Sequence, residues 1–408
     1  MDFDVASVRR SFPALDDGTA YFDGPGGTQV PRQVAAAMAE TLCAGISNRG
    51  TVTAAERRAD AVVSDARQAV GDLLGCDPGG VVFGRSMTTL TFDLARALAK
   101  TWGPGDEVVV TRLDHDANVR PWVTAAEQAG AVVRWVDFDP VTAELPLAAV
   151  QHQLTPRTRL VAFSGASNLF GTRPDVAAIT AAAHDVGALA YVDGVHLTPH
   201  SPVDVVALGA DFYACSPYKF FGPHHGVLVA DPGLLESVHP DKLLPSSDAV
   251  PERFEMGTLP YELLAGTTAA VDFLADMASS AAQRRSRVLE SMAAAAASEH
   301  RLFNRLLDGL ASIDAVTLHG RPASRTPTAL FSVAGHPPRG VHEHLAQRGV
   351  NAPAGSFYAL ECARALGLGA EGAVRAGIAP YTDESDVDRL LEAVTEIADS
   401  VAHRDAGR

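Results

Sequence analysis

The feature that most constrains this chain is a regular alternation of short apolar runs with longer amphipathic stretches between about residues 60 and 230. The apolar runs are rich in β-branched residues and are bounded by Gly, Pro or Asp, which is typical of buried strands. Strand–helix–strand alternation predicts an α/β fold with a mainly parallel sheet covered by helices on both faces. Seven strands are expected, at 81–85, 107–112, 131–137, 159–165, 188–194, 211–216 and 226–231.

The pattern changes after residue 262, where long helical stretches are followed by a smaller α+β region. A chain of 408 residues is too long for one ordinary core, so two domains are expected. We predict a large domain over 21–262 and a small C-terminal domain over 263–408. The first residues, 1–20, are expected to form a segment that packs on the small domain.

Charge and cysteine usage limit the partners that this chain can have. The formal net charge of −16 disfavours nucleic acid or an anionic membrane as a partner, because either needs a basic face. The N-terminal residues do not read as a secretory signal, and no apolar run is long enough to span a bilayer. The four cysteines lack metal-type spacing and are expected as reduced thiols in a cytoplasmic protein.

Polar residues follow several of the predicted strands. Ligands of open α/β sheets bind beyond the carboxyl ends of the strands, so these residues are expected at one edge of the sheet. They are Ser86 and Thr88 after the first strand, with Met87 between them, then His115, Asn168, Asp193 and His196, and finally Ser216, Tyr218 and Lys219.

Each of these residues, taken alone, has an ordinary structural explanation. Ser86 or Thr88 can cap a helix, and Asp193 can form a turn at the end of a strand. A single His115 is more often a hydrogen-bonded structural histidine, and a single Lys219 is more often a solvated surface lysine. Their arrangement at successive strand ends, on the side where a ligand is expected, favours a functional site.

Together these residues suit one cofactor, pyridoxal 5′-phosphate (PLP). Its aldehyde needs a primary amine for a Schiff base, which Lys219 offers and arginine cannot. Asp193 can keep the pyridine nitrogen protonated, so that the ring accepts electrons. The helix start at 86–88 can hold the phosphate through its N–H groups, and His115 can stack on the ring.

Other kinds of protein fit the sequence less well. A nicotinamide enzyme needs a GxGxxG motif after an early strand, and the GPGG run at 24–27 lacks that spacing. A metal site and a non-catalytic binding protein stay open as alternatives, although the lysine and the aspartate favour an enzyme. The candidate metal ligands are His196, His200, His224 and His225, but Pro199 separates the first two and no carboxylate is clearly placed.

The sequence resembles the cysteine desulfurase-like branch of the class V aminotransferases, which are fold-type I PLP enzymes. The likeness extends from YFDGPGGTQVP at 21–31 to the end of the chain and is most specific over 167–223. It implies that Lys219 forms the Schiff base and then moves the substrate α-proton. It also implies that Asp193 pairs with the pyridinium nitrogen and that His115 stacks on the cofactor ring.

The same resemblance implies the remaining contacts of the site. The phosphate would be held by Thr88, Ser216 and the N–H of Met87, and the phenol of Tyr218 could also reach it. Arg375 would clamp the substrate carboxylate through two parallel hydrogen bonds, with Asn168 beside it and beside the cofactor oxygen. Thr258 would reach the phosphate of the second subunit, so a homodimer with a shared active site is expected.

Three positions depart from the desulfurase pattern. Tyr358 stands where desulfurases carry a nucleophilic cysteine, and Cys362 comes four residues later. His196 replaces a glutamine, and Tyr218 replaces the histidine that usually precedes the lysine. Because a phenol cannot take sulfur as a persulfide, ordinary desulfuration is not expected unless Cys362 or another thiol reaches the site.

The sequence therefore predicts a PLP-dependent lyase or transferase that acts on an α-amino acid. The favoured reaction is β-elimination that cleaves the C–S bond of cysteine or a cysteine conjugate, with natural-product biosynthesis as a candidate setting. Gly26 in the GPGG run and Tyr358 in the opposite loop would leave room for such a substrate. Transamination, epimerisation, decarboxylation with oxidative deamination, desulfuration by a relocated thiol and non-catalytic PLP binding stay open as alternatives.

Overall fold

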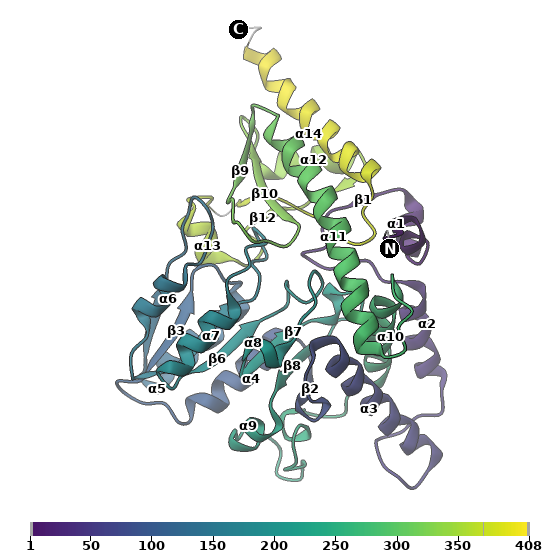
Figure 1. Cartoon of the computed structure of the whole chain (residues 1–408), viewed down its shortest axis with the longest axis vertical. Coiled ribbons are helices and arrows are strands. Elements are labelled where there is room, and N and C mark those ends of the chain that lie inside the picture. The colour runs from purple at the N-terminus through teal and green to yellow at the C-terminus, as the bar shows by residue number, and fades with distance from the viewer. Residues whose placement is uncertain (1–2, 370, 406–408) are drawn as a thin grey trace.

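The structure, a computed structural model, describes residues 3–369 and 371–405. Its centre is a seven-stranded sheet with the strand order β2-β8-β7-β6-β5-β3-β4 (Figure 1). Strand β8 runs antiparallel to both of its neighbours, and the other neighbouring pairs are parallel. The predicted α/β fold with a mainly parallel sheet is therefore confirmed. The strands are β2 (Val81–Gly84), β3 (Glu107–Thr111), β4 (Val132–Val136), β5 (Thr158–Ser164), β6 (Leu189–Asp193), β7 (Phe212–Cys215) and β8 (Gly226–Ala230).

The alternation of side chains along each strand divides the large core into two layers. On β5, Val161 and Phe163 join one layer, whereas Leu160 and Ala162 join the other. The first layer contains side chains of α3 (Ala54–Leu74), α7 (Val176–Asp185), α10 (Tyr261–Asp276) and α11 (Arg284–Ala311). The second contains side chains of α4 (Met87–Ala99) and α5 (Arg120–Ala129).

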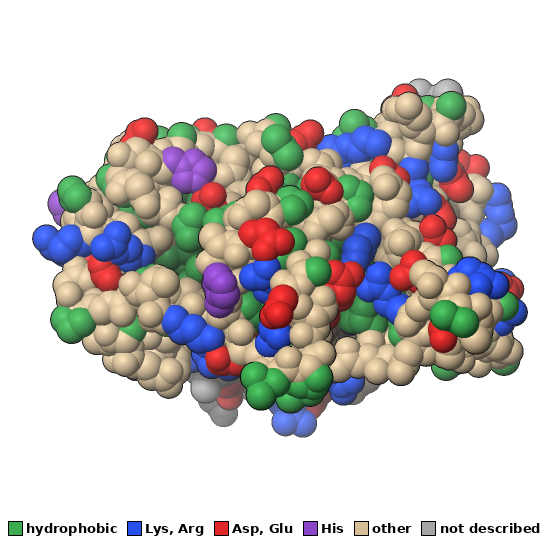
Figure 2. All heavy atoms as spheres, turned by 90° about the horizontal axis from the view of Figure 1, so that it is seen from below, with side chains coloured by type: hydrophobic (Ala, Val, Ile, Leu, Met, Phe, Trp, Pro, Cys, Tyr) green, Lys and Arg blue, Asp and Glu red, His purple; other side chains and the backbone are tan. Residues whose placement is uncertain are grey.

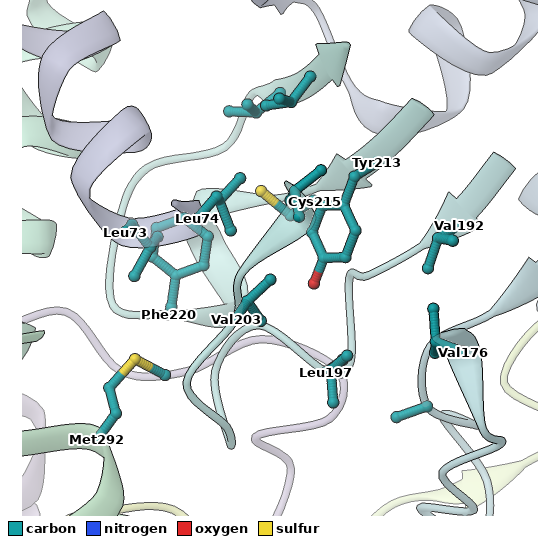
Figure 3. Close-up of a cluster of buried hydrophobic side chains, with 14 of the residues drawn as sticks. Leu73, Leu74, Val176, Val192, Leu197, Val203, Tyr213, Cys215, Phe220 and Met292 are labelled. Atoms are coloured by element: carbon teal, nitrogen blue, oxygen red, sulfur yellow. The ribbon is translucent and has the colours of Figure 1, made fainter. Parts of the chain in front are cut away.

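Figure 3 shows the first layer beneath the ends of β6 and β7. Cys215 of β7 lies beside Leu74 of α3, and Val192 of β6 lies beside Val176 of α7, with the ring of Tyr213 between the two pairs. All five side chains are almost completely buried, so they fix the position of the strand ends that carry the polar residues.

Local sequence signals explain where the covering helices begin. Ser86 caps α4 by accepting a hydrogen bond from the N–H of Thr89, and Asp175 caps α7 in the same way. Helix α3 begins with a capping box formed by Thr53 and Glu56. The shorter helices are α1 (Val5–Arg9), α2 (Arg32–Cys43), α6 (Leu147–Gln153), α8 (Val205–Leu208), α9 (Pro232–Ser237) and α13 (Leu360–Ala365).

A second sheet forms the centre of the predicted small α+β region. Its strands are antiparallel, in the order β12-β13-β10-β9. Helix α11 runs from the seven-stranded sheet to this region, where α12 (Pro338–Gln347) and α14 (Glu384–Asp405) pack (Figure 1). The strands are β9 (Val316–His319), β10 (Thr328–Val333), β12 (Ala354–Gly355) and β13 (Ala373–Gly377).

The N-terminal residues contact the C-terminal part of the chain. Arg9 of α1 forms ion pairs with Asp383 at 3.2 Å and Asp386 at 2.5 Å. Strand β1 (Ala20–Tyr21) pairs with β11 (Val350–Asn351), and α10 packs on α2 and α3. The domain limits at residues 20 and 262 stay predictions.

The surface is charged and mixed on the face shown in Figure 2. Basic and acidic side chains alternate there, with hydrophobic side chains in small groups between them. Positive charge is therefore not gathered into one continuous area on this face. Within residues 3–369 and 371–405, no helix has the length and apolar character needed to cross a membrane. The expected cytoplasmic location stays a prediction.

Candidate active site

A cavity of about 560 Å³ lies beyond the carboxyl ends of β5, β6 and β7. Residues of both sheets line the cavity, because Arg375 of β13 in the small sheet also forms part of its wall. Of the predicted site residues, Thr258 alone does not line it; this residue lies on an exposed segment. The predicted residues that line the cavity are Gly26, Ser86, Met87, Thr88, His115, Asn168, Asp193, His196, Ser216, Tyr218, Lys219, Tyr358 and Arg375.

Lys219 ends a short 3₁₀ turn, Pro217–Lys219, that follows β7. Its side chain is buried, and its Nζ donates a hydrogen bond to the carbonyl oxygen of Pro25. Burial and the nearby Arg375 lower the pKa of Lys219 to about 7, against the opposite effect of Asp193. A large share of the amine is therefore unprotonated, and nucleophilic, near neutral pH.

Asp193 is the last residue of β6 and lies opposite Ser164 of β5 and Ala214 of β7. One carboxylate oxygen accepts a hydrogen bond from the N–H of Val195 at 3.0 Å. Burial raises the pKa of Asp193 to about 6, and Lys219 partly opposes this shift. The next residue must be glycine, because a Cβ on Gly194 would lie 1.9 Å from the ring of Tyr213.

His115 follows β3 and caps the 3₁₀ turn Asp116–Asn118. Its Nδ1 accepts a hydrogen bond from the N–H of Ala117 at 3.0 Å, so the proton of the neutral ring lies on Nε2. Burial, with a smaller contribution from Lys219, lowers the pKa of His115 to about 4. The imidazole is therefore neutral at pH 7, a form that suits stacking on a cofactor ring.

Asp114, which the sequence did not single out, holds the loop that carries His115. Its carboxylate accepts hydrogen bonds from Asn118 at 2.6 Å and Ser164 at 2.9 Å, and from the hydroxyl of Thr111. Burial raises the pKa of Asp114 to about 7, although these three donors oppose the shift. Asp114 was missed because its partners come from two separate strands, β3 and β5, and from the turn after β3.

The start of α4 has the properties of a phosphate site. Ser86 satisfies the N–H of Thr89 at 3.1 Å, which leaves the N–H groups of Met87 and Thr88 without partners inside the helix. These groups and the helix dipole attract an anion. Gly226 on β8 permits this placement, because a Cβ there would lie 2.3 Å from the nitrogen of Met87.

Arg375 comes from β13 and is 2% exposed. Its Nη1 donates to the carbonyl oxygen of Asn168 at 3.0 Å, while its Nε has no partner among the described residues. The Oδ1 of Asn168 is also buried without a partner. Burial lowers the pKa of Arg375 to about 9, with Asp23 opposing the shift. A buried cation with an unused donor suits a carboxylate ligand.

Gly26 and Phe357 both lie close to this arginine. A Cβ on Gly26 would come within 3.3 Å of Nη2 of Arg375, so a glycine allows the turn to approach the guanidinium. The ring of Phe357 covers the guanidinium at 3.8 Å. Phe357 was not predicted, although it directly precedes the predicted Tyr358 in the sequence.

The two histidines beyond Asp193 have separate partners. His196 pairs through Nε2 with the hydroxyl of Thr328 at 3.0 Å, and its Nδ1 is buried without a partner in the described chain. Burial, and then the charge of His200, lowers the pKa of His196 well below its usual range. His200 pairs in turn with the buried carboxylate of Glu299 at 3.2 Å.

His224 and His225, the other two candidate metal ligands, also have partners. His224 stacks on the ring of Tyr218 at 4.6 Å, and His225 pairs with the hydroxyl of Thr267 at 2.6 Å. The described residues contain no group of three or more His, Cys, Asp or Glu side chains arranged to hold a metal ion.

Several further residues line the cavity and were not predicted. The sequence offered little signal for them, because their approach depends on how distant segments pack. His115 is flanked by some of them in LDHDANVR, which is the one local clue. They are Pro25, Phe92, Asp116, Ala117, Arg120, Ser164, Ala166, Val195 and Phe357.

All four cysteines lie in the described part of the chain, and none lines the cavity. Cys362 is on α13 and is fully buried, and burial raises the pKa of its thiol far above the usual range. Cys215 is also buried in the core, whereas Cys43 is exposed. The cavity is therefore built without a thiol of this chain.

The family model described as aminotransferase class-V matches residues 20–390. The chain belongs to this family and is a PLP-dependent enzyme with the fold-type I architecture. An uncharacterized protein of Mycobacterium tuberculosis is 37% identical, over 97% of this chain and 100% of its own length. Cysteine desulfurase CsdA of Escherichia coli is 32% identical, over 96% of this chain and 97% of its own.

Solved structures agree with this assignment. The crystal structure of CsdA from Escherichia coli, in its S-sulfonic acid form, matches with a TM-score of 0.86 and 28% identity. The match covers 98% of the present chain and 100% of the CsdA chain. A cysteine desulfurase from Thermococcus onnurineus shares the fold, with a TM-score of 0.86 and 24% identity. This match covers 97% of the present chain and 98% of the Thermococcus chain.

The cavity fits PLP on the chain's own geometry. It offers a buried amine at Lys219, a buried carboxylate at Asp193 and a helix start with free N–H groups at Met87 and Thr88. A neutral imidazole at His115 completes the set. When bound, PLP supplies a ring that withdraws electrons from the substrate α-carbon.

The lowered pKa of Lys219 predicts how the cofactor-free enzyme takes up PLP. The unprotonated amine is the reactive form, so the rate of covalent attachment should rise between pH 6 and pH 8 with a midpoint near 7. Stopped-flow absorbance after mixing cofactor-free enzyme with PLP measures this rate. The variant R375M should shift the midpoint upward, because it removes a nearby positive charge. A midpoint above pH 9 in the unchanged enzyme would contradict the prediction.

Proposed function

We propose that this enzyme cleaves the C–S bond of cysteine or a cysteine S-conjugate by β-elimination. The α-proton leaves the substrate, the C–S bond breaks, and sulfur departs with the electron pair of that bond and takes a proton. The organic product is 2-aminoacrylate, which water hydrolyses to pyruvate and ammonia. Relatives named cysteine desulfurases support chemistry on a cysteine sulfur.

The observation that carries this proposal is the absence of a thiol from the cavity wall formed by the described residues. A desulfurase needs a cysteine to accept sulfur, and here Tyr358 lines the cavity on the loop before α13. Cys362 is buried behind this loop, which disfavours a relocated sulfur acceptor. Sulfur would therefore leave as a free thiol or hydrogen sulfide.

We assign the catalytic roles to the residues that surround the cavity. Lys219 would hold the cofactor and then carry the substrate α-proton. Arg375 and Asn168 would bind the substrate carboxylate, and Asp193 would keep the cofactor nitrogen protonated. His115 would stack on the ring.

The remaining assigned residues bind the cofactor's other groups. The phosphate would rest on the N–H groups at the start of α4 and on the hydroxyls of Thr88 and Ser216, with Tyr218 beside them. His196 would face the cofactor oxygen with its unpartnered Nδ1.

We also propose a homodimer in which Thr258 of one protomer reaches the cofactor phosphate of the other. Thr258 is exposed and follows Met256, whose side chain is 64% exposed. Glu255 anchors this segment through two hydrogen bonds with the buried Arg67, both at 2.9 Å. Sedimentation velocity measures the assembly, and a fully active monomer would overturn the proposal.

The reaction is tested by offering cysteine and several S-substituted cysteines to the PLP-loaded enzyme. Pyruvate and thiol should form in a 1:1 ratio, with no protein-bound persulfide detected by mass spectrometry. Protein persulfide with alanine as product would overturn the proposal in favour of desulfuration. A keto acid that requires a second amino acid would indicate transamination, and CO₂ release with O₂ uptake would indicate oxidative decarboxylation.

The variant C362A gives a second check on the proposed reaction. Turnover should stay within about twofold of the unchanged enzyme, because this thiol does not line the cavity. The loss of a small buried group should cost about 1 kcal/mol of unfolding free energy, which thermal denaturation measures. A loss of turnover by more than tenfold at a temperature where the variant is fully folded would show that the thiol takes part.

A further inference from the structure

The loop before α13 places two successive aromatic residues in the left-handed region of backbone space. Phe357 has a φ of 50° and Tyr358 a φ of 58°. This conformation is unfavourable for residues other than glycine, because the Cβ comes too close to the following carbonyl oxygen. Two hydrogen bonds hold the loop in place. The side-chain Nδ2 of Asn168 donates to the carbonyl oxygen of Phe357 at 3.0 Å, and the N–H of Asp116 donates to the carbonyl oxygen of Tyr358 at 2.7 Å.

The result of this conformation is that both rings line the cavity. Phe357 covers the guanidinium of Arg375, the group assigned to the substrate carboxylate. The ring of Tyr358 lies 5.6 Å from that of His115, and it is 77% exposed. Tyr358 therefore stands at the mouth of the cavity, beyond the ring-stacking histidine, where the far end of a substrate would lie.

Some of the other side chains that line the cavity are apolar, and the charge of Arg120 is neutralised by ion pairs. Phe92 and Ala117 line the same cavity. Arg120 also lines it, but its Nη2 donates to Asp116 at 2.8 Å and to Glu361 at 3.4 Å. Glu361 accepts further hydrogen bonds from Arg112 and Arg364, both at 3.1 Å.

This arrangement discriminates between kinds of substrate. A substrate with a charged far end would have to compete with ion pairs that are already formed, and it would lose hydration without gaining a free partner. An apolar group would only replace water against the ring of Tyr358.

We propose that the substrate is a cysteine S-conjugate whose sulfur carries an apolar, planar group, and that Tyr358 is the residue that selects this group. This inference rests on the proposed elimination and names its substrate class. The reaction balance is unchanged, so the apolar group leaves as its thiol. Contact with one aromatic ring is expected to raise kcat/KM for such a substrate by about 10- to 100-fold.

The kinetic test compares three substrates, S-benzyl-L-cysteine, S-methyl-L-cysteine and S-carboxymethyl-L-cysteine, with pyruvate formation as the readout. The enzyme should prefer the benzyl over the methyl compound by at least about tenfold in kcat/KM, and should use the carboxymethyl compound least. The variant Y358N removes the ring but keeps a residue that adopts positive φ readily. It should lose most of the benzyl preference, because kcat/KM should fall much further for the benzyl than for the methyl compound. The matched variant Y358F should retain the preference.

A binding test separates this inference from the proposed reaction. The dissociation constants of the same three compounds are measured by calorimetry on PLP-loaded K219A protein, with and without Y358N. Tighter binding of the benzyl compound that depends on the Tyr358 ring supports the inference, even if no compound yields pyruvate and the elimination proposal fails. Equal binding of the three compounds, stronger binding of the carboxymethyl compound, or a benzyl preference that survives Y358N would overturn it.

Discussion

The variant K219A is expected to lose the visible absorbance of covalently attached cofactor and to turn over at least about a thousandfold more slowly. Among the described residues, Lys219 supplies the one primary amine of the cavity wall, and the same amine is assigned to the α-proton. Loss of a positioned acid–base group alone costs two to four powers of ten in rate. Absorbance spectra and pyruvate release measure the two effects.

The two other lysines of the chain provide controls for this variant. Lys100 lies on the surface, where its Nζ pairs with Asp241 at 2.6 Å, and Lys242 pairs with Asp248 at 2.9 Å. K100A and K242A should keep both the absorbance and the turnover. Covalent cofactor on K219A, found by mass spectrometry after reduction with borohydride, would show that the attachment site has been misassigned.

The variant D193N is expected to keep the covalent cofactor but to lose roughly two to four powers of ten in kcat. Its amide cannot hold the positive charge of a protonated cofactor nitrogen, so the ring would withdraw electrons poorly. The removal of one member of a buried charge pair typically costs about 3 to 5 kcal/mol, which gives the stated loss. Visible absorbance and turnover, measured on the same sample, distinguish this result from that of K219A.

Asp211 offers a matched control for Asp193, because it lies near the opposite end of β6. Its carboxylate accepts a hydrogen bond from the N–H of Ala190 at 2.7 Å and pairs with His184. D211N should lower stability without a comparable loss of turnover. If D193N turned over at nearly the normal rate, the pyridinium role would have to pass to another group.

The strands of the large sheet could be predicted because their signals are local. Each is a short β-branched run closed by Gly, Pro or Asp, and all seven were found close to their observed limits. The residues at the strand ends then follow from the topology of parallel sheets, which brings their carboxyl ends to one edge. Lys219 and Asp193 could therefore be placed together from the sequence.

The outer wall of the cavity could not be predicted in the same way. Phe357 reaches Arg375 only because two residues in succession adopt positive φ, and no glycine marks this turn. Arg120 is neutralised by Glu361, 241 residues away. Such contacts depend on tertiary packing rather than on local patterns.

Buried thiols show a further limit of sequence reasoning. Cys362 follows Tyr358 by four residues, so spacing alone leaves it within reach of the cavity. The packing of α13 places it in the core instead. The burial of Cys362 disfavours a role as sulfur acceptor, and the spacing of residues does not reveal that burial.

The two sheets supply different halves of the site. Lys219 and His115 follow strands of the seven-stranded sheet and Asp193 ends one, whereas Arg375 lies on β13. Thr328, the partner of His196, lies on β10, opposite Gly377 of β13. Faults confined to the small sheet would therefore leave Lys219 and Asp193 in place and impair the proposed binding of the substrate, and they would reach the cofactor only through the contact between Thr328 and His196. In a collection of random variants, the yellow colour of the bound cofactor would therefore report mainly on the seven-stranded sheet, whereas turnover would report on both sheets.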